Sequence, residues 1–272
     1  MKEIAKLQKK ATEIRIEVLR MIYQAGAGHI GGAFSSIDIL TALYYDVMNI
    51  DPTNPEWELR DRFILSKGHV VEALWSILAD KGFIEKAELT TFSQFGTRLI
   101  GHPNNKIAGV EMNTGSLGHG LSVATGIALA AKIDRKSYRT YTLMGDGELA
   151  EGSIWEAAMS AAHYKLDNLV AIIDRNRMQI SGMTEDVMRL ESLVEKWESF
   201  GWDVVTINGH DVMKLVHVLS EAPRVSGRPT LIIANTVKGK GISFAENVAS
   251  WHHHIPTQEQ YDLALKELEE LV

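Results

Sequence analysis

Two short polar segments each follow a stretch that reads as a β-strand, and their residue types could hold a metal ion beside an anion. Gly145-Asp146-Gly147 follows the apolar run 140–144, and Asn176 follows the run 169–173. Residues 153–164 between the runs have helical composition and an apolar face, which predicts a β-α-β unit. Because the crossover makes the two strands parallel, both polar segments are expected at the same edge of one sheet.

The chemistry of these segments is that of a diphosphate site. The Asp146 carboxylate and the Asn176 amide oxygen suit a hard divalent cation, Mg²⁺ or else Ca²⁺ or Mn²⁺. Gly145 and Gly147 would let backbone N–H groups approach an anion at the start of the next helix, whose dipole favours negative charge. Asp-Gly is also a common hairpin signal. Residues 148–162, however, have the composition of a helix and not of a returning strand.

The elements around this unit predict an α/β fold. Roughly five parallel strands with interleaved helices imply an open, doubly wound and mainly parallel sheet with helices on both faces, in a single domain covering residues 1–272. The predicted elements are an amphipathic helix from Ile4 to Ile22, a helix capped by Ser35 and Ser36, helices at 70–80, 212–220 and 258–271, and strands at 62–65, 204–207 and 230–237.

Composition excludes several classes of function. The 272 residues carry a net charge of −7, which leaves no surplus of cations for nucleic acid. The absence of cysteine excludes disulfides, thiolate catalysis and Cys-zinc sites. The charged N-terminus lacks a signal-peptide apolar region. The apolar run 121–131 is too short to span a bilayer and predicts a buried helix or part of a subunit interface. A cytoplasmic protein without a membrane partner is therefore expected.

Four loops carry histidines that could face a ligand. His29, His69 and His102 each stand beside glycine, and His252 begins a run of three histidines. A histidine has a pKa close enough to neutrality to bind diphosphate, donate to a carbonyl or move a proton. The alternative is that each histidine satisfies local backbone groups. Zinc binding by residues 252–254 is not expected, because three successive side chains cannot all point at one ion from a regular element.

Three further motifs have both a structural and a functional interpretation. The glycine-rich turn 113–120 precedes an apolar helix, so it could serve close packing or a ligand. Lys238-Gly239-Lys240-Gly241 resembles a phosphate loop only loosely, because it lacks the Walker spacing, and a solvated turn is the alternative. Glutamates 148, 151 and 156 carry favourable charge for a helix N-terminus.

With these residues in view, the chain resembles thiamine diphosphate enzymes, and within them the transketolases. The family signature is Gly-Asp-Gly followed by an asparagine pair. Here the pair is Arg175-Asn176, so the second asparagine, the metal ligand of the family, is kept. The stretch 145–182 is similar to transketolases throughout, and the resemblance covers nearly the whole chain. It implies thiamine diphosphate as the cofactor and a metal ion held by Asp146, Asn176 and the backbone carbonyl of Met178.

The resemblance also implies roles for other residues. His253 stands where the family has glycine, so it could share the role of His252. The resemblance implies contact with the diphosphate, thiazolium and substrate hydroxyls for His29, His69, His102 and His252, and contact with the aminopyrimidine for Thr114, Gly115, Ser116 and Leu117. It implies proximity to the diphosphate for Gly145, Gly147 and Lys238. For Glu151 it implies a place in a carboxylate network between the two active sites of a dimer.

In full-length transketolases the glutamate that activates the pyrimidine and the arginines that bind sugar phosphates lie in a second domain. The sequence ends at residue 272, after the diphosphate-binding domain. The chain thus resembles the N-terminal subunit of a split transketolase, moving a two-carbon ketol unit from a ketose phosphate to an aldose phosphate. The resemblance implies a C-terminal partner with the pyrimidine domain, in a heterotetramer with two copies of each chain.

Two other interpretations remain open. The chain could be the corresponding subunit of a 1-deoxyxylulose-5-phosphate synthase-like or 2-oxo acid dehydrogenase-type enzyme. It could also be a non-catalytic scaffold that binds the cofactor. The set of His29, His69 and His102 favours transketolase.

Overall fold

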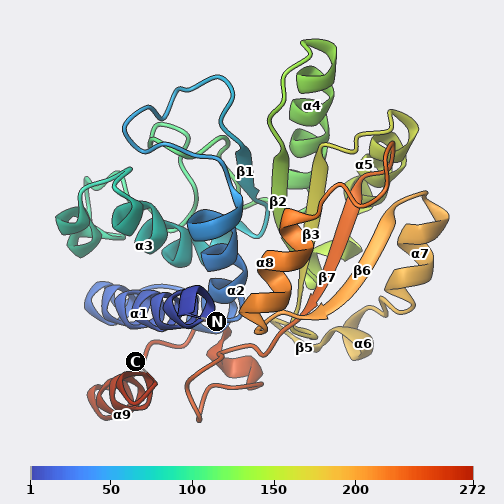
Figure 1. The fold of residues 1–272 in the computed structure, drawn as a ribbon. Coiled ribbons are helices and arrows are strands. Elements are labelled where there is room, and N and C mark those ends of the chain that lie inside the picture. Colours follow the sequence, from blue (N-terminus) through green and yellow to red (C-terminus); the bar gives the residue numbers. More distant parts are fainter. Residues whose placement is uncertain (1, 272) are drawn as a thin grey trace.

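The computed structural model describes residues 2–271, and five parallel strands form its central sheet (Figure 1). The order across the sheet is β1-β2-β3-β7-β6. This confirms the predicted parallel sheet, with strand bounds within about two residues of those expected. The strands are β1 (Arg62–Leu65), β2 (Thr140–Gly145), β3 (Leu169–Arg175), β6 (Asp203–Asn208) and β7 (Thr230–Asn235).

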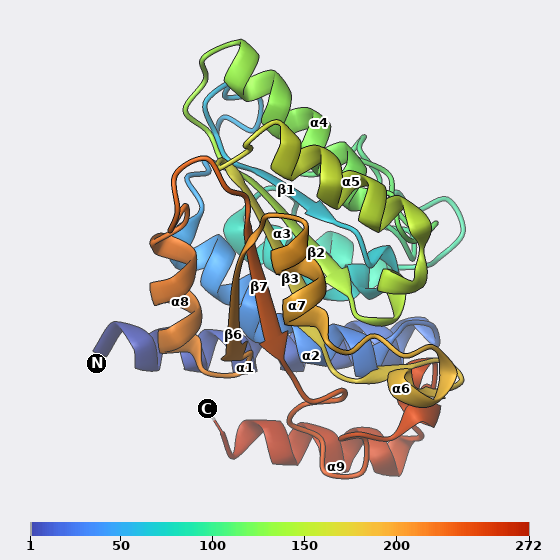
Figure 2. The same cartoon turned by 90° about the vertical axis from the view of Figure 1, so that its right-hand side faces the viewer.

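Helices cover both faces of this sheet (Figure 2). Successive side chains of a strand point to opposite faces, so in β3 Val170 and Ile172 enter one apolar core while Ala171 and Ile173 enter the other. Burial on both faces explains why the strands read as continuous apolar runs. The first core is covered by α1 (Lys2–Ala25), α2 (Ile30–Ala42), α3 (Val71–Lys81), α8 (Val212–Ser220) and α9 (Gln258–Glu269), and the second by α4 (Gly120–Ile133), α5 (Gly152–His163) and α7 (Leu193–Ser199).

The predicted helices are all present, but α2 begins earlier than expected, and α7 was not predicted. The predicted cap at Ser35 and Ser36 is wrong, because α2 already begins at Ile30 and both serines are buried within it. Their hydroxyls donate to the carbonyl of Gly32 and to the Asp174 carboxylate, at 2.6 Å from Ser35 and 3.1 Å from Ser36. The serines therefore satisfy buried acceptors and not the free N–H groups of a helix start.

Small elements that were not predicted follow β3. A two-stranded antiparallel hairpin joins β4 (Met178–Gln179) to β5 (Gly182–Met183), and the short helix α6 (Thr184–Val187) comes next. Short turns of 3-10 helix occur at η2 (Gly68–Val70), η3 (Lys86–Thr91), η4 (Gly147–Ala150) and η5 (Ala249–His252), and a π-helical turn, η1 (Leu43–Val47), extends α2. Within residues 2–271, each helix is too short or too polar to cross a membrane.

The strand order brings remote segments to one edge. Register pairs Leu65 with Leu143, Gly145 with Asp174, and Arg175 with Asn235, so the loops that follow β1, β2, β3 and β7 leave the sheet side by side. Ligands of open α/β sheets bind at this carboxyl edge. His69, Asp146, Asn176 and Lys238 follow these same strands.

Candidate functional site

A pocket of about 350 Å³ opens at the carboxyl edge of the sheet. Its walls come from the loops after β1, β2, β3 and β7, from the loop before α2 and from η5. The structure therefore brings together side chains that are far apart in the sequence. The predicted site residues that line the pocket are His29, His69, Gly115, Leu117, Gly145, Asp146, Gly147, Asn176, Met178, Lys238 and His252.

Asp146 and Asn176 are neighbours on one wall, as the β-α-β unit predicts. Asp146 is buried, and its Oδ2 accepts hydrogen bonds from the backbone N–H of Arg177 at 2.6 Å and from Arg175 Nη1 at 3.0 Å. Asn176 Oδ1 accepts the N–H of Met178 at 3.1 Å. Burial, together with nearby Asp174, raises the pKa of Asp146 above its usual value. A cation beside this carboxylate would therefore relieve an electrostatic cost.

The glycines of the Gly-Asp-Gly turn differ from expectation. The N–H of Gly147 donates to Asp146 Oδ1 at 2.8 Å, and that of Gly145 donates to Glu148 Oε2 at 3.1 Å. The helix α5 begins only at Gly152, after the turn η4. The N–H groups that were expected to face an anion thus donate to two buried carboxylates, because a buried carboxylate requires hydrogen-bond donors. Gly147 also permits close packing, since a Cβ there would lie 3.0 Å from the Cβ of Gln179.

Two buried lysines supply positive charge to the pocket. Lys67 pairs with Asp174, and its Nζ also donates to the carbonyl of Gly32 at 3.3 Å. Lys238 Nζ lies 2.9 Å from His252 Nδ1, so its neighbour is an imidazole and not a carboxylate. Burial and the charge of Lys67 lower the pKa of Lys238 to about 8, which leaves it mostly protonated at neutral pH. Lys238 is therefore placed to pair with an incoming anion.

Four buried residues of the site were missed by sequence reasoning. Asp174 accepts hydrogen bonds from both α2 serines and from Thr236, and although burial opposes its ionisation, Lys67 lowers its pKa below the usual value. The feature of the sequence that could have identified the four residues is their position, because each stands at or just after the carboxyl end of a strand. The four residues are Lys67, Glu148, Asp174 and Arg175.

Glu148 joins three segments beneath the pocket. It accepts hydrogen bonds from the hydroxyl of Ser66, from the N–H of Gly118 at 2.8 Å and from the N–H of Gly145. Burial raises its pKa. Sequence reasoning treated this glutamate as helix-start charge, but the structure makes it the support of the Gly-Asp-Gly turn.

The histidines meet at the open side of the pocket. The ring centroids of His29 and His69 are 5.2 Å apart, and those of His69 and His252 are 5.4 Å apart. Burial, reinforced by Lys67, lowers the pKa of His69 well below its usual value. Burial and Lys238 lower the pKa of His252 to about 3. Both rings are therefore neutral at neutral pH, and each can donate only one hydrogen bond.

The glycine-rich turn 113–120 lies against the remaining predicted histidine. Gly115 has φ +148°, and a Cβ there would lie 2.7 Å from His102 Cδ2, so this glycine lets the half-buried His102 approach the site. Thr114 ties the turn to the end of β1 by donating to the carbonyl of Leu65 at 2.7 Å. Ser116 and Glu151 are exposed and do not line the pocket.

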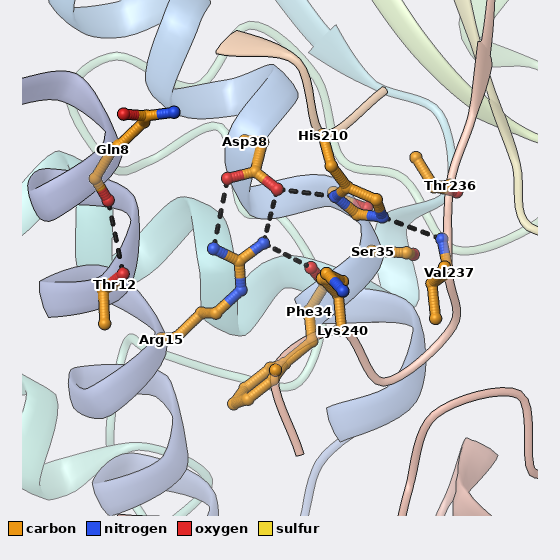
Figure 3. Close-up of polar contacts among 12 residues, drawn as sticks. Gln8, Thr12, Arg15, Phe34, Ser35, Asp38, His210, Thr236, Val237 and Lys240 are labelled. Carbon is orange, nitrogen blue, oxygen red and sulfur yellow. Dashed lines mark hydrogen bonds and ion pairs between the residues drawn. The ribbon is translucent and has the colours of Figure 1, made fainter. Parts of the chain in front are cut away.

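A buried polar chain anchors the loop that carries Lys238 (Figure 3). Arg15 of α1 donates to both oxygens of Asp38 of α2, at 3.1 and 2.6 Å. Asp38 Oδ2 lies 2.6 Å from His210 Nδ1, and His210 Nε2 accepts the backbone N–H of Val237 at 2.8 Å. Although burial opposes ionisation, Arg15 lowers the pKa of Asp38 to about 2. An ionised carboxylate thereby orients His210 toward the loop.

Comparison with known proteins agrees with this geometry. Residues 7–266 match the family described as the transketolase thiamine diphosphate binding domain. The chain belongs to this family. One of the subunits of the apulose-4-phosphate transketolase of Phocaeicola vulgatus is 50% identical over 270 residues, which cover 99% of this chain and 96% of that relative. A 6-deoxy-6-sulfo-D-fructose transketolase subunit of Clostridium sp. (strain MSTE9) is 45% identical over 97% of this chain and 96% of its own length.

Solved transketolases show the same fold. The transketolase of Campylobacter jejuni superposes with a TM-score of 0.92 at 34% sequence identity, over 97% of this chain but only 42% of its own. The chain thus spans less than half of that solved transketolase and nearly all of the two subunits above. These matches confirm the predicted family, its α/β fold and the resemblance to N-terminal subunits of split transketolases.

Proposed function

We propose that the chain is the thiamine diphosphate-binding subunit of a two-chain transketolase that moves a two-carbon ketol unit from a ketose phosphate to an aldose phosphate. The observation that carries the proposal is the pocket itself. Asp146 and Asn176 bring oxygen ligands to the pocket, and Lys67 and Lys238 bring buried positive charge. His69 and His252, which are neutral at neutral pH, line the same pocket. Similarity to two subunits of split transketolases supports it.

The donor set fits a magnesium ion. Asp146 supplies a carboxylate, Asn176 an amide oxygen and Met178 a backbone carbonyl, which are the hard oxygen ligands that Mg²⁺ prefers. Ca²⁺ or Mn²⁺ would accept the same ligands. Arg177 lies between Asn176 and Met178 and adopts φ +66°, which turns the chain sharply between these two ligands. The ion would neutralise Asp146 and hold the diphosphate against Lys238.

Each side chain of the pocket then has a definite task. When bound, the cofactor supplies a nucleophilic thiazolium carbon that accepts the two-carbon unit. Lys67, Lys238, His69 and His252 provide positive charge and N–H donors for the diphosphate end. His29 lines the pocket and His102 lies against its lining residue Gly115, and both would bind the hydroxyls of the ketose. Burial lowers the pKa of His102, and a neutral ring suits this task because it can donate to one oxygen and accept from another.

The pyrimidine end of the cofactor requires a second chain. We propose a C-terminal subunit that supplies the pyrimidine domain, in a heterotetramer with two copies of each chain. The α4 helix supports self-association, because Leu121 and Ala128 face the core whereas Gly126 and Ala130 on the opposite side are exposed and small enough for another helix to approach. Glu151, also exposed, would join the carboxylate network at this contact.

Reconstitution tests the proposal. The chain and a candidate pyrimidine-domain partner would be purified separately, mixed with thiamine diphosphate and Mg²⁺, and assayed on a panel of ketose donors and aldose acceptors. Ketol transfer is expected only from the mixture. A parallel mixture with Asp146→Ala controls for contaminating host transketolase. Ketol transfer by the chain alone, or decarboxylation of 2-oxo acids in its place, would overturn the proposal.

A further inference from the structure

Three histidines from two remote segments converge at the mouth of the pocket. His29 precedes α2, while His252 ends η5 and His253 follows it. One ligand nitrogen from each ring lies within 4.8 Å of the other two. The ring centroids of His29 and His253 are 4.2 Å apart, and the ring planes cross at 51°. These rings are tilted and not stacked, so their nitrogens can face a common point.

The third ligand comes from outside the histidine run. His254 turns away, with its ring centroid 4.5 Å from that of Trp251. His254 therefore does not belong to the cluster that His252 and His253 form with His29. His29 joins the cluster because the start of α2, which directly follows it, packs against η5 and the loop after β7. A Cβ on Gly31 of α2 would meet the carbonyl of Trp251 in η5, and the Gly31 carbonyl accepts the N–H of Gly239 in the loop at 2.9 Å.

A buried carboxylate stands behind His29. Glu72 is fully buried, and its Oε1 accepts the backbone N–H of His29 at 2.9 Å and lies 3.6 Å from the ring Nδ1. Within residues 2–271, neither His29 Nδ1 nor Glu72 Oε2 has a hydrogen-bond partner. A metal-binding histidine is usually oriented by a hydrogen bond from its other ring nitrogen to a carboxylate. The 3.6 Å contact of His29 Nδ1 with Glu72 is just longer than such a bond, so a small rotation of the ring would form it and leave Nε2 for the ion.

The distances suit a tetrahedral ion after a small adjustment. Nitrogens that bind one Zn²⁺ at about 2.0–2.1 Å lie roughly 3.3 Å apart, and the three nitrogens here lie within 4.8 Å of one another, so each pair must close by at most about 1.5 Å. Rotation of the exposed His253 and the half-buried His252 supplies this movement. Lys238 Nζ lies 2.9 Å from His252 Nδ1. For His252 to bind the ion through Nε2, the ring proton must move to Nδ1, so the Lys238 ammonium must give up this contact when the ion binds.

We propose that His29, His252 and His253 form a three-histidine site for Zn²⁺ or a similar transition-metal ion. The site is chemically distinct from the oxygen donors at Asp146 and Asn176, because imidazole favours zinc, copper and nickel whereas carboxylate and amide oxygens favour magnesium. All five side chains line one pocket. An ion on the three histidines would therefore occupy the side from which a sugar enters and would inhibit the enzyme.

Cobalt titration of the purified chain tests the site without any enzyme activity. Excess Mg²⁺ first fills the oxygen site, and Co²⁺ is then added as a spectroscopic probe, since a tetrahedral nitrogen-bound Co²⁺ absorbs visible light far more strongly than an octahedral oxygen-bound one. One equivalent should bind and be displaced by Zn²⁺. His29→Ala and His253→Ala should each weaken binding at least about tenfold, and Glu72→Gln about 10- to 100-fold.

His254→Ala is the matched control and should bind Co²⁺ like the unaltered chain, because this ring faces Trp251. If His29→Ala misfolds by circular dichroism, the exposed His253 carries the test. Absence of the visible band, or equal weakening in the His254 variant, would overturn the proposal in favour of adventitious binding to surface imidazoles. If Co²⁺ binding passes these controls but Zn²⁺ does not inhibit the reconstituted enzyme, the metal site is supported and its inhibitory role is refuted.

Discussion

Arg175 Nη1 donates to Asp146 Oδ2 at 3.0 Å, and both side chains are almost completely buried. Arg175 stands where the family signature has its first asparagine. The arginine at this position is a cation that binds Asp146, the proposed metal ligand. The same guanidinium reaches Glu185 at 3.1 Å and Glu191 at 2.8 Å, on the segment after the β4–β5 hairpin. The replacement therefore couples the proposed metal site to residues 185–191.

Removing this cation should destabilise the chain in a metal-dependent way. Breaking a buried ion pair from one side costs about 3–5 kcal/mol, because the remaining charge is left unpaired. Arg175→Gln is expected to lose stability of that size in urea unfolding with EDTA, and to regain part of it with Mg²⁺, which restores positive charge beside Asp146. Arg177→Gln, a nearby exposed arginine, is the control. Equal losses in the two variants would contradict the coupling.

Loss of the Asp146 carboxylate should abolish metal-dependent cofactor binding. Asp146→Ala removes a proposed ligand, whereas Asp186→Ala removes an exposed acid from the neighbouring segment and should have no effect. Calorimetric titration of thiamine diphosphate into each reconstituted complex, with Mg²⁺ and with EDTA, measures the difference. Unchanged affinity in the Asp146 variant would remove that residue from the metal site.

Diphosphate binding should weaken as pH rises through the pKa of Lys238. Because the pKa is lowered to about 8, the ammonium is present below that pH and is lost above it. Affinity for inorganic diphosphate should therefore fall between about pH 7 and about pH 9, with proton uptake on binding near the upper end. Lys238→Met should weaken binding at pH 7 and remove this pH dependence.

Lys240→Met is the matched control for that experiment. Lys240 belongs to the same loop but pairs with Glu246 at 3.0 Å and does not line the pocket. Its variant should keep the pH dependence of the unaltered chain. A fall in affinity that persists without Lys238 would assign the titration to another group.

The histidines on the open side should act on turnover and not on cofactor affinity. His29→Ala and His102→Ala in the reconstituted complex are each expected to lower turnover roughly ten- to a thousand-fold, the usual range for one positioned polar group. Thiamine diphosphate affinity, measured on the same samples, should remain unchanged. A variant with full turnover would exclude that histidine from the site, and one with lost cofactor affinity would place it at the diphosphate.

Much of the fold was predictable from local patterns. The apolar runs 140–144 and 169–173 indicated β2 and β3 because strands buried on both faces read as continuous apolar stretches. The crossover rule then placed Asp146 beside Asn176 without any knowledge of contacts. The start of α2 was missed because Ser35 and Ser36 have the residue type of a cap, and only the position of Asp174 shows what they bind.

The residue types that follow each strand can be read from the sequence, and the parallel sheet implies that they share one edge. How the buried charges pair across that edge depends on packing and cannot be read from the chain. Lys67 with Asp174, and Arg175 with Asp146, are partners because the packed sheet leaves no water to solvate them. The convergence of His29 with His252 and His253 was likewise decided by packing, since loops from opposite ends of the chain meet there and no local pattern records their distance.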